Sequence, residues 1–311
     1  MARRRSTRQR QVFAAAVRSL GGRAGRGSPM RDEFFSVSRP DGTTRHPMAE
    51  LMSSRATSGG GRGGQTRVAL YLSAIWLGVA GDHSTRRPAS FWASLLGLDD
   101  PDDRGSRVIR STWAELQERR FVRIEPGNHA GDVPTIHPLR EDGSGLPYTR
   151  PDGQGDDTYR RIPEKFLEVL VPETELTGPG LVMYLVAVRT ALVGQRTEGL
   201  TFSRSYVTRT FGVGESTRRA GLRNLTDLMV LDAHKRFVDD DGDLLGRRRQ
   251  RTVYDLLAPF EPTLPIGSGP DTAARIEPVA ATLHPFGTPS VPTGTPEWPP
   301  PGATDADVPV F

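Results

Sequence analysis

The feature that most constrains the fold is a pattern of two helices and a strand that occurs twice in the chain. The helices are expected at 90–98 and 107–116 in the first copy, and at 205–213 and 216–225 in the second. Each pair predicts a short helix, a turn at a glycine and a second helix. Apolar segments typical of strands follow at 121–124 and 230–233. The chain is therefore expected to contain two similar units.

The repeat extends beyond these helices. Two further pairs of segments align with each other, 46–51 with 162–167 and 68–75 with 181–188. Each copy also ends in a predicted β-hairpin, at 122–139 and at 230–257, where the Asp-Gly pair at 241–242 is a strong turn signal. Three helices followed by such a hairpin form a winged helix. We therefore predict a mainly α protein of the α+β class, with two tandem winged-helix domains and β-hairpin wings.

Composition changes along the chain and indicates its organisation. Residues 1–64 contain 13 arginines and 4 acidic residues, whereas the last 53 residues contain 13 prolines and 6 acidic residues against one arginine. A basic end and an acidic, proline-rich end are typical of a nucleic-acid-binding protein with a separate protein-recruiting segment. The predicted parts are a basic flexible arm (1–32), winged-helix domain 1 (33–140), a linker (141–158), winged-helix domain 2 (159–258) and a disordered Pro-rich acidic tail (259–311). Within the arm, the apolar spacing from Gln9 to Leu20 is that of an amphipathic helix.

The second helix of each pair has an apolar face and a polar face. The residues expected to face the core are Ile109, Trp113 and Leu116 in the first copy, and Leu222, Leu225 and either Leu228 or Met229 in the second. A helix of this kind fits the major groove, where Arg pairs with guanine and Asn with adenine, and an Arg-rich hairpin suits phosphates. The candidate DNA-binding residues are Arg107, Arg110 and Ser111 in the first copy, Ser216, Arg218, Arg219, Arg223 and Asn224 in the second, and Arg247, Arg248, Arg249 and Arg251 in the second hairpin.

The two copies are not equivalent as DNA readers. The first carries an acidic insert, 99–103, just before its second helix. Acidic side chains there are expected to cap the helix, but they repel phosphates. We therefore expect domain 2 to be the main DNA reader and domain 1 to form a dimer or bind a weaker half-site.

Segment 202–231 resembles the winged helix–turn–helix superfamily. The tandem arrangement over roughly 45–258, including Ile162–Leu167, resembles the replication initiators of plasmids and phages. That resemblance implies one domain that dimerises and one that reads repeated origin sites. The last residues resemble the tip of bacterial single-stranded-DNA-binding proteins, which implies that they recruit replication proteins. The residues of this tip are Asp305, Asp307, Pro309 and Phe311.

Other classes of function find little support. The chain has no cysteine, no phosphate-binding Gly-Lys motif, no clustered catalytic residues and no apolar segment long enough to span a bilayer. His129 and His137 are too few to form a metal site. We therefore expect no enzyme activity, no cofactor, no metal and no membrane contact, and a cytoplasmic, nucleoid-associated protein.

The leading hypothesis is a sequence-specific double-stranded-DNA-binding protein. All but two of the 41 basic residues are arginine, which is typical of GC-rich genomes, so the arginine count alone does not indicate DNA binding. Within this hypothesis we favour the replication initiator of a plasmid or mobile element in a GC-rich bacterium. A transcriptional regulator or partition protein on the same fold is an alternative, and a protein-binding adaptor is another.

Overall fold

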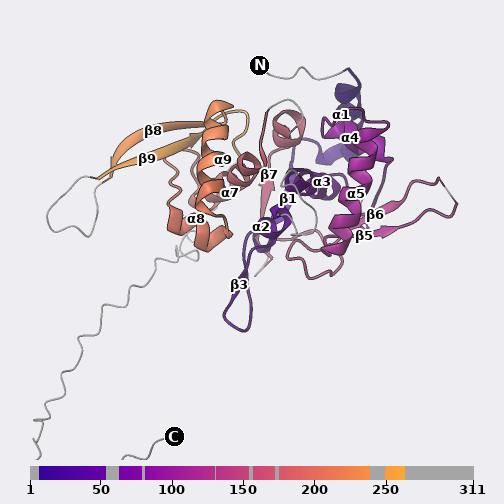
Figure 1. Ribbon diagram of the computed structural model, residues 1–311, viewed down its shortest axis with the longest axis horizontal. Coiled ribbons are helices and arrows are strands. Elements are labelled where there is room, and N and C mark those ends of the chain that lie inside the picture. Colours follow the sequence, from indigo (N-terminus) through magenta and orange to yellow (C-terminus); the bar gives the residue numbers. More distant parts are fainter. Residues whose placement is uncertain are drawn as a thin grey trace, which may run out of the picture. The chain divides into compact units, whose positions relative to one another are not determined.

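The computed structural model describes residues 7–53, 63–78, 81–129, 131–153, 157–171, 175–238 and 249–262 (Figure 1). They belong to one compact unit, Met1–Pro265. Helices combine with small antiparallel sheets, which confirms the α+β class. Among the described residues, no helix combines the length and apolar character needed to cross a membrane. The proline-rich tail lies outside the described residues from 263 onward.

The first half of the chain begins with one long helix and a short strand. Its helices are α1 (Thr7–Leu20), α2 (Pro47–Met52), α3 (Gly63–Leu77), α4 (Ala89–Leu95) and α5 (Arg104–Glu118), with 3-10 turns η1 (Gly21–Arg23) and η2 (Asp32–Phe34). Its strands are β1 (Ser28–Arg31), β2 (Val37–Ser38), β3 (Thr44–Arg45), β4 (Thr85–Arg86), β5 (Val122–Glu125) and β6 (Thr135–Pro138). Strands β4, β6 and β5 form an antiparallel sheet in that order beside α5.

The second half repeats the order that runs from α3 to β6 in the first. This order is a long apolar helix, a segment that pairs with the hairpin, a short helix, a second helix and the hairpin. Its elements are β7 (Tyr159–Ile162), the π-helix η3 (Phe166–Leu170), α7 (Gly178–Gly194), α8 (Arg204–Phe211), α9 (Glu215–Asp227), β8 (Leu231–Val238) and β9 (Arg249–Leu256). Leu200 pairs with Tyr254 of β9 at the position that corresponds to β4 in the first half. Both predicted hairpins are therefore confirmed as antiparallel strand pairs, β5–β6 and β8–β9.

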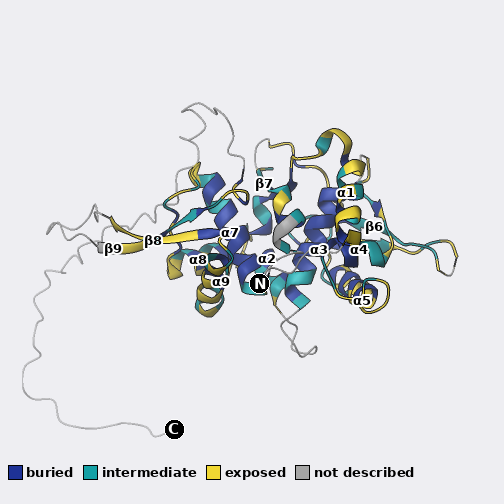
Figure 2. Ribbon diagram, turned by 90° about the horizontal axis from the view of Figure 1, so that it is seen from above, coloured by how far each residue is buried: buried dark blue, intermediate teal, exposed yellow. Residues whose placement is uncertain are grey.

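Helices α3 and α7 form the centre of the core because they are apolar on nearly all sides (Figure 2). The shorter helices pack against them with one face. The core-facing residues predicted for α5 are buried, as are Leu222 and Leu225 of α9. Leu228 packs against the core, whereas Met229 is 75% exposed. The turns between the paired helices contain Gly97 and Gly212, whose positive φ angles of 68° and 65° suit glycine.

The amphipathic helix predicted over Gln9–Leu20 is confirmed as part of α1, but the prediction that 1–32 is a flexible arm is wrong for the described residues. Helix α1 buries Phe13, Ala16 and Leu20, and the ring of Phe13 stacks on Trp76 with centroids 5.7 Å apart. Strand β1 pairs with β7, with Ser28 opposite Ile162. The segment is ordered because the apolar face of α1 is buried against the core and because the backbone groups of β1 form hydrogen bonds with β7.

The predicted linker also packs into the fold. Glu141 is fully buried and accepts a hydrogen bond of 2.8 Å from Arg31 Nη1, and Tyr148 is only 5% exposed. Contacts join the two halves directly: the ring of Phe35 lies edge-on to Phe211, with centroids 6.0 Å apart. The two copies therefore share one core, where the sequence indicated two domains joined by a linker.

Candidate nucleic-acid interface

Helix α9 presents a continuous exposed face. Its members are Ser216, Arg219, Ala220 and Arg223, as expected from the sequence. On the opposite face, Gly221 lets α9 approach α7 closely, since a Cβ at this position would lie 2.3 Å from the carbonyl oxygen of Pro179. The exposed face carries two guanidinium groups and two small residues that leave room for a partner surface, and the exposed carboxylate of Asp227 follows them at the end of the helix.

Arg218 has a structural role. Its Nε and Nη2 donate hydrogen bonds of 2.8 Å to Glu215, and its Nη1 donates to the carbonyl oxygen of Phe202 at 2.9 Å. Arg219 Nε also donates to Glu215, at 2.5 Å. These arginines, Arg218 first, lower the pKa of Glu215 to about 2. Arg218 thus fixes the start of α9, and we remove it from the candidate DNA contacts.

Asn224 is also engaged within the protein. Its Oδ1 accepts hydrogen bonds from the backbone nitrogen of Thr177 at 2.9 Å and from the Thr177 hydroxyl at 3.0 Å, and its Nδ2 donates to the carbonyl oxygen of Glu175 at 3.2 Å. Thr177 is the N-cap of α7. An amide with these partners has little capacity left to pair with adenine, so we also remove Asn224 from the candidate contacts.

The β8–β9 hairpin follows α9 directly and carries further positive charge. Its register places Arg236 opposite Arg251, and Lys235, Arg236 and Arg251 are exposed. Arg249 lies opposite Val238 at the last described pair, while Arg247 and Arg248 lie outside the described residues. The sequence reasoning missed Lys235 and Arg236, as well as Phe237, which is 63% exposed. Successive side chains of a strand point to opposite faces, so Lys235 and Phe237 lie on one face of the hairpin and Arg236 on the other.

Three possible metal ligands meet at the base of the same hairpin. Asp232 lies opposite Asp255, His234 follows on the same face, and their ligand atoms lie within 4.8 Å of one another. One Asp255 oxygen already accepts a hydrogen bond from the backbone nitrogen of Gly199 at 2.7 Å. Only strand pairing brings these residues together, so the sequence did not indicate them.

Helix α5 has an exposed face of the same kind as that of α9. Arg107, Arg110 and Ser111 are exposed as expected, but Arg107 forms an ion pair of 2.6 Å with Asp103. The Ser111 hydroxyl donates a hydrogen bond of 2.9 Å to the carbonyl oxygen of Val108 in the same helix. Arg219 of α9 is paired with Glu215 in the same way, so ion pairing does not distinguish the two faces.

The acidic insert before α5 binds α1. Arg8 donates to Asp102, at 2.7 Å from Nη2 to Oδ1. The expected acidic cap does not form, because Asp103 at the N-cap makes no side-chain capping bond. The carbonyl oxygen of Asp100 accepts the bond from the backbone nitrogen of Gly105 instead, at 2.8 Å.

Comparison of the chain with models of protein families, with curated proteins and with solved structures finds no match. The geometry of α9 and the following hairpin is therefore the basis for any inference about function.

Proposed function

We propose that this chain is a tandem winged-helix protein that binds double-stranded DNA sequence-specifically through α9 and the β8–β9 hairpin. The main support is the exposed α9 face with Arg219 and Arg223, followed at once by a hairpin with exposed basic residues. The order of helices and hairpin, present in both halves, is that of a winged helix, in which the second helix of the pair enters the major groove.

Each part of this surface has a distinct role in the proposal. Arg223 and Arg219 pair with guanine edges, and Ser216 and Ala220 let the helix approach the bases. On binding, Arg219 leaves its ion pair with Glu215 and pairs with the base instead. The side chain is free to make this change because it is 75% exposed. The hairpin residues are assigned to phosphates, which position the protein without reading sequence.

Selection from a random DNA library by the full-length protein at about 150 mM salt tests sequence-specific binding. We expect a short motif in the recovered DNA. Arg223→Ala should weaken binding to that motif by about 1–3 kcal/mol and relax the preference at one base pair. The control is Arg18→Ala, which changes an exposed arginine of α1. Equal losses on motif and random DNA would contradict base reading by Arg223.

The salt dependence of binding tests the hairpin. Replacing Lys235 and Arg236 by alanine should reduce the slope of log affinity against log salt by about 0.9 for each lost phosphate contact, on all sequences. The same reduction is expected for Arg247→Ala, Arg248→Ala, Arg249→Ala and Arg251→Ala. An unchanged slope would show that the hairpin stays in solvent.

As the biological role we propose a replication initiator of a plasmid or mobile element, based on the resemblance described above. The recovered motif tests it: spaced repeats beside an origin support it, whereas a promoter or a centromere-like array favours a regulator or partition protein. Uniform, salt-labile binding without any motif would favour an adaptor. Dimer formation through the first half and recruitment of replication proteins through Phe311 remain part of the proposal; Phe311 lies outside the described residues.

A further inference from the structure

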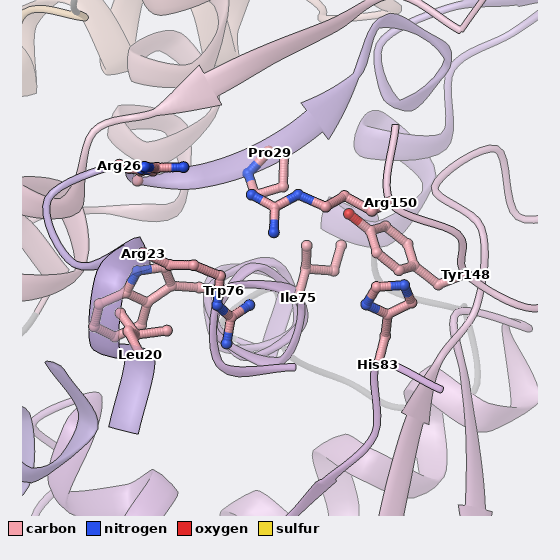
Figure 3. Close-up of a pocket in the computed structure, with 10 residues that line it drawn as sticks. Leu20, Arg23, Arg26, Pro29, Ile75, Trp76, His83, Tyr148 and Arg150 are labelled. Atoms are coloured by element: carbon pink, nitrogen blue, oxygen red, sulfur yellow. The ribbon is translucent and has the colours of Figure 1, made fainter. Parts of the chain in front are cut away.

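A small cavity lies in the first half of the chain (Figure 3). Its apolar side is formed by Leu20 of α1 and by Ile75 and Trp76 of α3. None of the residues that line it belongs to α9 or to the β8–β9 hairpin. Its enclosed volume of about 20 Å³ holds one or two water molecules or a single small ion, so a larger ligand would extend through the mouth into solvent.

Positive charge is concentrated around this cavity. Arg23 and Arg150 point into it from opposite sides, His83 completes the wall, and Arg26 lies at the rim (Figure 3). No acidic residue is among the described residues that line the cavity. The pKa of Arg23 is lowered, first by burial and then by the charge of Arg150. Two guanidinium groups thus face each other without a carboxylate between them, an arrangement that an anion would stabilise.

Two buried hydrogen-bond donors also line the cavity. Tyr148 is 5% exposed and Trp76 is 2% exposed. The Tyr148 hydroxyl and the Trp76 Nε1 have no hydrogen-bond partner among the described residues. Because buried polar groups normally have a partner, these donors indicate an acceptor that is supplied from outside the chain. Guanidinium, hydroxyl and indole groups together match an oxyanion, which accepts hydrogen bonds only.

We propose that this cavity binds the phosphate group of a small molecule, with Arg23 and Arg150 pairing with its charge and Tyr148 donating a hydrogen bond. The enclosed volume takes one or two of the phosphate oxygens, and the rest of the phosphate and of the ligand lies at the mouth beside Arg26. This site is independent of the proposed DNA surface, so each can fail without the other.

Calorimetric titration of the full-length protein with inorganic phosphate, at constant ionic strength, tests the site. We expect saturable binding to one site, weakened about tenfold or more by Arg23→Gln or Arg150→Gln, since each removes a charged hydrogen-bond donor. The matched control is Arg18→Gln, an exposed arginine on α1 outside the cavity, which should bind phosphate as the unmodified chain does. Absence of saturable binding, or equal weakening by Arg18→Gln, would overturn the proposal.

A second measurement does not depend on the arginine variants folding. Burial, Arg150, Arg23 and Arg31 lower the pKa of His83, and Asp82 opposes them. A phosphate in the cavity adds negative charge, so NMR titration of the His83 ring should show its pKa rising when phosphate is added. No change in that pKa at saturating phosphate would place the anion elsewhere and overturn the site.

Two further experiments test how the ligand is bound and which kind of ligand it is. Tyr148→Phe keeps the ring that packs against His83, at 5.2 Å between centroids, and removes only the hydroxyl, so it should weaken phosphate binding while the thermal unfolding temperature is retained. Unchanged affinity would overturn the role of Tyr148. Duplex DNA of random sequence should leave bound phosphate in place. Displacement by that DNA would assign the cavity to the DNA backbone and overturn the small-molecule proposal.

Discussion

At the scale of single residues, Arg31 shows how one buried charge connects segments that are far apart in the chain. Its Nη1 donates to Glu141 at 2.8 Å, its Nη2 donates to the carbonyl oxygen of Thr149 at 2.8 Å, and its Nε donates to Asp157. Burial alone lowers the pKa of Arg31, but the two carboxylates raise it above its ordinary value. The side chain therefore stays charged and ties β1 to the segment that the sequence indicated as a linker.

Arg31→Met should be strongly destabilising. It leaves Glu141, which is fully buried, without its cation, and loss of one partner of a buried pair costs about 3–5 kcal/mol. Urea unfolding of the full-length chain measures this loss. The double variant Arg31→Met, Glu141→Gln should recover part of it, because the unpaired charge is gone. A loss below about 1 kcal/mol would show that the pair behaves like an exposed one.

His83 makes stability depend on pH in a direction that can be tested. Its pKa in the folded protein lies below 6.5, chiefly because of burial. As the pH falls through 6.5, the unfolded chain binds a proton that the folded protein does not, so the free energy of unfolding falls. His83→Asn should make the pH dependence of stability between about pH 7 and pH 5 flatter. Asparagine tolerates the φ of 55° at this position, and an unchanged slope would contradict the assignment.

At the scale of elements, α9 combines a packed face with an exposed charged face. Gly221 and Leu222 bring it against α7, while Arg218 fixes its first turn and Asn224 connects its last turns to the start of α7. These contacts hold the exposed face in one orientation. A rigid element is what a base-reading surface requires, because misplaced side chains lose their hydrogen bonds.

Asn224→Ala separates the structural role from base reading. It removes the hydrogen bonds to Thr177 at the N-terminus of α7 and should lower the free energy of unfolding by about 1–2 kcal/mol. The base preference recovered from a random library should be unchanged. Arg223→Ala should show the reverse, with stability retained and preference relaxed. Loss of preference at an adenine in the Asn224→Ala variant would return this residue to the DNA contacts.

At the scale of the whole molecule, the two copies of the repeat depend on each other. Strand β1 of the first half is the partner of β7 in the second, and Arg189 of α7 contacts Asp32 at 3.3 Å and lies over the rings of Phe35 and Phe211. Separate domains would leave these groups exposed or unpaired. The described chain is therefore expected to unfold as one cooperative unit.

Cutting the chain at the predicted linker tests this interdependence. A fragment of residues 159–262 should lack a cooperative thermal transition, because β7 loses its partner strand β1 and Phe211 loses its contact with Phe35. A fragment of residues 7–262 is the control and should unfold as the full-length chain does. Circular dichroism measures both. A sharp transition of the shorter fragment at the full-length midpoint would show that the halves are independent domains.

Periodicity in the sequence was sufficient for the paired helices and hairpins of the repeat and for the direction of the side chains on α9. The spacing of Leu222 and Leu225 predicted the buried face of α9 and therefore the exposed Arg219 and Arg223. The same reasoning failed for Arg218 and Asn224, since it gives the direction of a side chain but not its partners. Hydrogen bonds to Phe202 and Thr177 depend on segments brought together by folding.

The sequence by itself determined the repeated order of helices and hairpins, because local propensity and apolar spacing act within a few residues. Only the tertiary structure decided that the N-terminal segment belongs to the core, that the predicted linker holds a buried ion pair, and that Arg23 meets Arg150 in a cavity. Arg31 and Glu141 are 110 residues apart. Pairing over such a separation has no local signature; it follows from which surfaces remain to be covered once the helices have formed.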